Sequence, residues 1–241
     1  MSGIFEQLQG LLAHLGEKQI LVLRVLGAEI RVDWRTIVMS WIVMAILIGL
    51  ALWLRRALRQ PVEEKPNRTQ AALDALIDLL RSQLGSSFAS EQLAVRMFPF
   101  ISTLFLYVLI SNWLGIIPYL EAPTQNLNVT LGLAFLVFFI SQSLAVRHRG
   151  IKSYLKGFLE PSPVLLPMNI IGEIARPLSH AFRLFGNTLA GTFLITVIMV
   201  KFVPILVPSV LTMVFTLFFG AIQAFVFAIL AVAYINVAVE A

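Results

Sequence analysis

The stretch LPMNIIGEIARPLSHAFRLFGNTLAGTFLITVIMV (166–200) decides the fold of this chain of 241 residues. It contains almost no helix breaker besides Pro167 and Pro177, and the sequence after Pro208 contains no proline. Helices of about thirty residues reach roughly 45–50 Å, whereas the hydrocarbon core of a bilayer is about 30 Å thick. We therefore predict two long helices, 166–200 and 205–239, that tilt steeply or kink in a membrane and form an antiparallel hairpin.

The composition excludes an ordinary soluble protein. Hydrophobic residues make up 59% of the chain and charged residues 13%, against roughly 45–50% and about 25% in soluble domains. A single soluble core cannot bury so much apolar surface, and disordered chains are poor in it. The sequence therefore predicts an all-α, multi-pass membrane protein that lies in the lipid bilayer. Cysteine is absent, which excludes disulfides, thiolate metal sites and cysteine catalysis.

Three further spans are predicted from apolar runs of about 20 residues. They cover about 36–54, 97–118 and 129–146, which gives about five transmembrane helices in one transmembrane domain over 36–241. Residues 1–35 have mixed polarity, so we expect an extramembrane or interfacial segment there, without the layout of a cleavable signal peptide.

The stretch 71–84 has a different pattern from the spans. Leucine and isoleucine recur at helical spacing, with Asp74, Asp78 and Arg81 between them. This pattern predicts an amphipathic surface helix. The pattern alone does not decide between contact with lipid and packing on the protein itself.

Basic residues indicate the topology. They gather after the first predicted span and after the third, at Arg55, Arg56, Arg59, Arg147, Arg149 and Lys152. Loops rich in lysine and arginine stay on the cytoplasmic side. We therefore expect the N-terminus outside, the turn of the long hairpin near Lys201–Pro208 outside, and the C-terminus in the cytoplasm. The net charge of +5 then reflects topology, and because no basic run is interleaved with aromatic residues we expect no nucleic-acid partner.

Charged residues inside the first long helix are the main functional signal. At the bilayer centre one charge costs about 2.5–3.5 kcal/mol on insertion scales. Helical spacing predicts one shared polar face, made of Arg176, Ser179, His180, Arg183 and Asn187. Arg183 lies near its middle and, unlike Arg176, cannot extend its side chain to the membrane surface, so it needs an anionic partner or a water-filled cavity. Glu173 is ten residues away, about 15 Å along the helix, so we expect the partner of Arg183 on another helix or another chain.

The other polar residues also have structural interpretations. Glu173 is as well explained by an i,i+3 ion pair with Arg176 as by a functional role. His180 is better explained as a hydrogen-bonding partner between helices than as a metal ligand, because no second histidine stands at the spacing of a metal site. We therefore expect no metal site. Asn187 and Ser179 could join helices. In the last helix, Gln223 could bond a facing arginine, and Gly186, Gly191 and Gly220 could let helices approach closely.

Motifs of soluble enzymes are absent from the sequence. It contains no GxxxxGK[ST], GxSxG or HExxH pattern. We therefore expect a chain that is not an enzyme on its own, binds no nucleotide and needs no cofactor.

The blocks RPLSHAFRLFGN (176–187) and GAIQAFVFAILAVAYI (220–235) resemble subunit a of rotary F-type ATP synthases, as do NWLGIIPY (112–119) and PTQNLNVT (123–130). The resemblance covers about 30–241. It implies five membrane-spanning segments plus an amphipathic surface helix, with the last two helices curving around a ring of c subunits. It also implies b-type peripheral stalk subunits and the remainder of the ATP synthase complex as partners, and a bacterial inner membrane as the location.

The resemblance further implies a mechanism. Arg183 matches the family's arginine, with Asn187, Ser179 and Gln223 matching its polar companions. An arginine favours the charged form of a carboxylate, whereas desolvation favours the neutral form. Each c-subunit carboxylate would therefore release its ion beside Arg183, between two offset half-channels. Flow of H⁺ or Na⁺ would then turn the ring and drive ATP synthesis, or run in reverse.

The chain differs from the family pattern at positions where members of the family usually carry an acidic residue. Those positions hold Asn126, Asn169, Thr192 and Thr216. One interpretation is that Glu173 and His180 mark a relocated inner proton path, with threonines and water on the outer side. The other is a sodium-translocating variant, because oxygen ligands and water can carry Na⁺ without a proton relay. An independent secondary transporter is a third interpretation, but it lacks the internal repeats typical of that class.

Overall fold

The computed structural model describes residues 20–25, 28–57, 68–117, 120–159, 162–201 and 206–240. Its long helices are α2 (Trp34–Ala57), α3 (Arg68–Gln83), α4 (Glu91–Leu114), α5 (Leu127–Arg149), α7 (Leu166–Lys201) and α8 (Leu206–Glu240). The short helices are η1 (Gly85–Ser87), η2 (Pro123–Gln125), α6 (Ile151–Gly157) and η3 (Pro163–Leu165). The prediction of an all-α membrane fold is confirmed for the described residues from Trp34 onward, where every regular element is a helix.

A small antiparallel hairpin precedes the helices. Strands β1 (Ile20–Val25) and β2 (Ala28–Asp33) pair with Ile20 opposite Asp33. The hairpin lies within the segment expected outside the membrane, whose residues 1–19 are outside the described residues. The sequence analysis did not predict these strands.

Within the described residues, four helices are long and apolar enough to cross a membrane. They are Trp34–Arg56, Glu91–Leu114, Leu127–Arg149 and the Thr216–Glu240 part of α8. Helix α7 has the predicted extent but is not among the four. Only the backbone of its residues 194–200 is described, so the count of four does not take in the most apolar stretch of α7.

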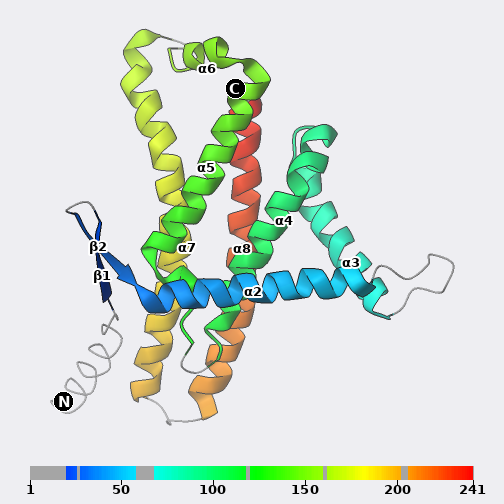
Figure 1. Cartoon of the computed structure of the whole chain (residues 1–241), viewed down its shortest axis with the longest axis vertical. Coiled ribbons are helices and arrows are strands. Elements are labelled where there is room, and N and C mark those ends of the chain that lie inside the picture. Colours follow the sequence, from blue (N-terminus) through cyan, green and yellow to red (C-terminus); the bar gives the residue numbers. More distant parts are fainter. Residues whose placement is uncertain are drawn as a thin grey trace.

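Helices α7 and α8 form the predicted long hairpin. They contain 36 and 35 residues, which corresponds to just over 50 Å each at about 1.5 Å per residue. Figure 1 shows them antiparallel and side by side, with α2 crossing them at a large angle. When α2 stands upright in a bilayer, the hairpin is therefore strongly tilted. Residues 202–205 of the predicted turn lie outside the described residues.

Helix α8 forms the centre of the bundle, because α4, α5 and α7 all pack against it. Its contact face carries the small buried residues Ala224, Ala228 and Ala231. In lipid, helices associate through close packing and hydrogen bonds rather than through the hydrophobic effect. At Gly220 a Cβ atom would lie 3.1 Å from the Asn112 Cβ, so α4 and α8 approach most closely there.

The amphipathic helix α3 packs on the protein itself. Leu80 and Leu84 are buried in the core shared with α4, whereas Asp74 and Asp78 are exposed. Leu79 is nevertheless 58% exposed, so part of the apolar side of α3 faces outward.

Polar contacts bring three segments together at one end of the molecule. The Asn236 side chain of α8 accepts from the Ala89 amide at 3.2 Å and donates to the Ser87 carbonyl at 2.7 Å. Arg149, at the end of α5, donates to the Ala238 and Val239 carbonyls at 2.5 and 3.2 Å. These bonds satisfy the last carbonyls of α8. The basic end of α5, the end of α8 and η1 are therefore at the same level (Figure 1).

We predict that Gly220→Ala destabilises the fold by about 1–3 kcal/mol, as overpacked cores do. The new methyl group presses on Asn112, whose side-chain amide donates to the Gly220 carbonyl at 3.0 Å. The measurement is the thermal midpoint of the purified assembly. Gly132→Ala is the matched control, since a Cβ there meets nothing within 4 Å. Equal midpoints for the two variants would contradict the close approach.

Candidate functional site

Arg183 lies on the exposed side of α7. Ser179 and Asn187, one turn before and after it, are exposed on the same side, and Ala181 and Leu184 are buried on the opposite side. Arg183 forms no ion pair within the described part of the chain. The expectation that Glu173 does not pair with it is met, since Glu173 pairs with Arg176. The guanidinium group therefore points away from its own bundle without an acidic partner.

His180 does not belong to this exposed face, so the prediction of one shared polar face is wrong for it. Its side chain is 1% exposed and packs on the Phe227 ring at a centroid distance of 3.8 Å. Nε2 lies 3.2 Å from the Phe227 carbonyl oxygen. A carbonyl only accepts, so Nε2 carries the hydrogen and Nδ1 is left as an acceptor, with no partner in the part of the chain that the structure describes.

Gln223 bonds asparagine rather than arginine. The Asn187 side-chain amide donates to Gln223 Oε1 at 2.5 Å, which joins α7 to α8 one turn from Arg183. Gln223 is 6% exposed, and its own Nε2 finds no partner among the described residues. The expectation of a Gln223–arginine bond is therefore corrected. The bond holds the Asn187 side chain in place and leaves the buried Nε2 group of Gln223 available as a donor near Arg183.

Gly186 and Gly191, two of the three glycines expected where helices approach closely, face open space instead. A Cβ at Gly186 or Gly191 would meet nothing within 4 Å, unlike Gly220. The surface of α7 is therefore open at these two glycines, so another helix can approach it closely there.

The end of α7 toward Lys201 has hydroxyl and amide groups. Gln125 of η2 donates to Thr192 Oγ1 at 2.9 Å, and Thr192 donates to the Thr188 carbonyl at 3.1 Å. Thr216 is half-buried on α8, two turns before Gln223. The loop before α5 is held by Thr124, whose hydroxyl donates to Asn112 at 2.7 Å.

The opposite end of α7 carries a carboxylate site. Arg176 donates to Glu173 Oε1 at 2.5 Å, and Gln142 of α5 donates to Glu173 Oε2 at 2.7 Å. The Tyr154 hydroxyl donates to Gln142 Oε1 at 2.8 Å. The structural interpretation of Glu173 as an ion-pair partner is thus correct. The same carboxylate also lines a cavity of about 390 Å³ together with Arg149, Tyr154, Asn169 and Arg176; a functional role for Glu173 stays a prediction.

A second, much smaller cavity continues inward from Glu173. Its volume of about 10 Å³ is close to the minimum that holds one water molecule, and its lining includes Ser141, Gln142, Glu173, Arg176 and Tyr234. The Tyr234 ring lies 5.3 Å from the His180 ring. Polar groups therefore lead from the large cavity toward the helix turn that precedes Arg183.

Tyr154, in the loop helix α6, has a raised pKa. Burial is the main cause, and the negative charge of Glu173 raises the pKa further, while Arg149 lowers it. The phenol therefore stays protonated and keeps donating to Gln142 above its ordinary pKa of 10.0.

Sequence reasoning missed Gln142, Tyr154 and Gln125. A usable signal existed for Gln142, which is polar inside the apolar run of α5; Tyr154 and Gln125 lie in loops where polar residues are ordinary. In the described part of the chain, no three histidine or acidic side chains come together to hold a metal ion.

Comparison with known proteins gives consistent matches over most of the chain. The family model for the ATP synthase A chain matches residues 37–236. ATP synthase subunit a 1 of Crocosphaera subtropica is 42% identical over 83% of this chain and 84% of its own. ATP synthase subunit a 2 of Picosynechococcus is 39% identical over 83% of each chain. Subunit a 2 of Acaryochloris marina is 36% identical over 84% of each chain.

We predict that Glu173→Gln lowers the pKa of Tyr154, because it removes a negative charge that opposes phenolate formation. Ultraviolet difference absorbance of the assembly measures this titration, with Tyr154→Phe as the subtraction. Glu121→Gln, a change at an exposed carboxylate paired with Arg35, is the control and leaves the titration unchanged. Tyr154 also contributes to the pH dependence of the free energy of unfolding. This contribution is constant below the pKa that the phenol has in the unfolded chain. The contribution falls as the pH rises above that pKa, because the phenol ionises first in the unfolded chain. A Tyr154 titration unmoved by Glu173→Gln would contradict the assignment.

Proposed function

The chain belongs to the ATP synthase A chain family, and from this premise we propose that it is the stator subunit that couples ion flow to rotation of a c-subunit ring. Members of this family are membrane subunits of ATP synthase that do not themselves catalyse ATP chemistry. The proposed motor uses the membrane potential, which supplies about 2.3 kcal/mol per charge and 100 mV. Rotation then drives ATP synthesis elsewhere in the complex, or hydrolysis drives the reverse rotation.

The observation that carries this proposal is the unpaired guanidinium of Arg183. It is exposed on α7, and the described chain supplies no carboxylate for it. A buried or membrane-embedded charge needs an opposite charge or water. The carboxylate of a passing c subunit supplies that charge. Beside Arg183 this carboxylate favours its ionised form, so it releases its ion there and binds one again after it moves away.

The surroundings of Arg183 suit a moving partner. Gly186 and Gly191 leave room for a helix of the ring, since side chains from the bundle do not occupy their space. The bond from Asn187 to Gln223 holds the surface of α7 to α8 on the bundle side. Because the long hairpin is steeply tilted, the Arg183 face of α7 extends further along the membrane plane than the face of an upright helix would.

The inner half-channel is assigned to the cavity of about 390 Å³ that contains Glu173. This cavity lies at the end of the molecule where α5 ends in Arg147 and Arg149, which the positive-inside rule places in the cytoplasm. Glu173 bonds Gln142, which accepts from Tyr154. These groups can hold water and exchange protons at the mouth of the path, and the small cavity beside Tyr234 continues it inward.

The outer half-channel is assigned to the surface near Thr192 and Thr216. The Thr192 hydroxyl is bonded by Gln125, and Thr216 is half-buried on α8. The carboxylate at Glu173 favours H⁺ as the coupling ion. The threonine hydroxyls on the outer path favour Na⁺ as a second candidate, because hydroxyl and carbonyl oxygens are ligands that hard cations accept.

The partners follow from the same assignment. The ring faces α7, b-type peripheral stalk subunits hold the chain against rotation, and the rest of the ATP synthase complex completes the motor. The location is a bacterial inner membrane, with the N-terminus outside and the C-terminus in the cytoplasm beside α6 and the basic end of α5.

We predict that Arg183→Ala abolishes coupled ATP synthesis while the complex still assembles, because each ring carboxylate loses the charge that makes it release its ion. ATP synthesis by the purified complex in energised vesicles measures this. Arg35→Ala is the control: its pair with Glu121, at 3.5 Å, has side chains about half exposed, and such pairs contribute little. Normal synthesis by the Arg183→Ala complex would refute the proposed mechanism.

The coupling ion is decided by ATP hydrolysis of the intact complex across a sodium titration at fixed pH and ionic strength. A proton motor shows no sodium response, whereas a sodium motor is activated at low-millimolar Na⁺, with Na⁺ protecting the ring carboxylate from carbodiimide. In the proton case we expect Glu173→Gln to slow turnover about a hundred-fold, the lower end of the range for loss of a proton-transfer group. Glu121→Gln is the matched control. Unchanged turnover in a sodium-independent Glu173→Gln complex would remove Glu173 from the path.

A further inference from the structure

We propose that the groove between α3 and α4 binds an acidic phospholipid, with the lipid phosphate on Arg81. The groove has a volume of about 550 Å³ and lies on the far side of α4 from the Glu173 cavity. This inference does not depend on the proposed function, since it concerns other helices and another side of the molecule.

The walls of the groove are mostly apolar. Ile77 of α3 and Val95 of α4 are 38% and 62% exposed. Phe88, Ala94 and Phe98 complete the apolar lining. Such surface on a membrane subunit suits the acyl chain of a lipid.

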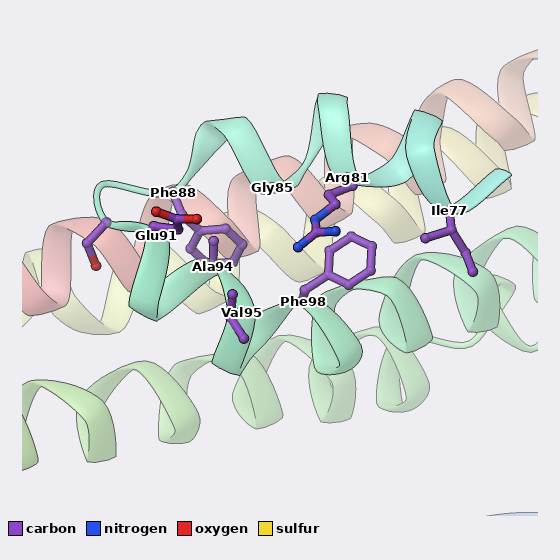
Figure 2. A pocket seen from close by; sticks show the side chains of 9 residues that line it. Ile77, Arg81, Gly85, Phe88, Glu91, Ala94, Val95 and Phe98 are labelled. Carbon is purple, nitrogen blue, oxygen red and sulfur yellow. The ribbon is translucent and has the colours of Figure 1, made fainter. Parts of the chain in front are cut away.

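Arg81 supplies the charge that selects the headgroup. Figure 2 shows its guanidinium directed from α3 into the groove, beside the Phe98 ring. It forms no ion pair within the described part of the chain. Arginine binds phosphate through several donors in a fixed geometry. Glu91, at the Phe88 end of the groove (Figure 2), disfavours an anion at that end, so the phosphate is directed to Arg81.

The groove also lies at the level of a membrane surface. Its end at Phe88 and Ser90 adjoins the η1 turn, which Asn236 ties to the last turns of α8. Arg149 ties the basic end of α5 to the same turns of α8. Helix α3 is amphipathic, with Asp74 and Asp78 exposed beside its apolar side. Arg81 is therefore held where lipid phosphates lie, at the basic end of the molecule, which attracts acidic lipids.

Lipid crosslinking in the intact complex tests this site. The complex is reconstituted in vesicles of phosphatidylcholine with a minor fraction of phosphatidylglycerol, and Val95 is replaced by a photoreactive phenylalanine. Mass spectrometry identifies the lipids attached to it. We expect phosphatidylglycerol to be enriched about five-fold over its bulk fraction, which corresponds to the attraction of one arginine near a membrane surface.

Two further variants assign the effect to Arg81. Arg81→Gln returns the crosslinked lipids to bulk composition, and Arg81→Lys retains enrichment. Arg96→Gln is the matched control, because Arg96 is an exposed arginine of α4 outside the groove lining and its loss leaves the enrichment in place. Bulk composition among the lipids crosslinked in the complex that retains Arg81 would mean unselective lipid contact and overturn the proposal. Crosslinks to another subunit would mean that a protein covers the groove, which also overturns it.

Discussion

The mismatch between helix length and bilayer thickness governs the arrangement of this chain. Helices of 36 and 35 residues are far longer than a hydrocarbon core of about 30 Å requires. Tilting them keeps their apolar surface in lipid, and it places different turns of α7 at different depths. Glu173 and Thr192 lie toward opposite ends of one helix, with Arg183 between them. A tilted helix can therefore meet water at both membrane faces and still carry a guanidinium group at its middle.

The tilt is stabilised by contacts that do not need a hydrophobic driving force. Small residues let α8 pack closely on its neighbours, most tightly where Gly220 meets Asn112. The polar bonds lie at the margins: Asn236 and Arg149 hold the last turns of α8, and Asn187 joins α7 to α8 beside the exposed face. This arrangement keeps α7 fixed on one side while its other side is left open for a partner.

Much of the fold could be predicted from the sequence, because helix length and apolar runs are local properties. The extents of α7 and α8 and the amphipathic α3 were predicted in this way. The face of His180 could not be, since helical spacing places it within reach of both the exposed and buried sides. The packing of His180 against Phe227 places it on the buried side, and that contact joins residues 47 positions apart. Gln142, which bonds Glu173, and Tyr154, which bonds Gln142, were missed for the same reason, because they come from α5 and α6.

The two ends of α7 differ chemically, and this difference limits which mechanisms are compatible with the chain. Near Glu173 the groups are a carboxylate, a guanidinium, an amide and a phenol around a cavity of about 390 Å³. Near Thr192 they are hydroxyls and an amide, already bonded to one another. A carboxylate can take up and release a proton near neutral pH when its surroundings tune it, whereas a threonine hydroxyl cannot. Proton flow past Thr192 therefore requires a file of water molecules, and Na⁺ flow requires only oxygen ligands. The described helix residues near Thr192 include no titratable group, so in the proposed motor ion selection falls to the ring carboxylate that faces Arg183.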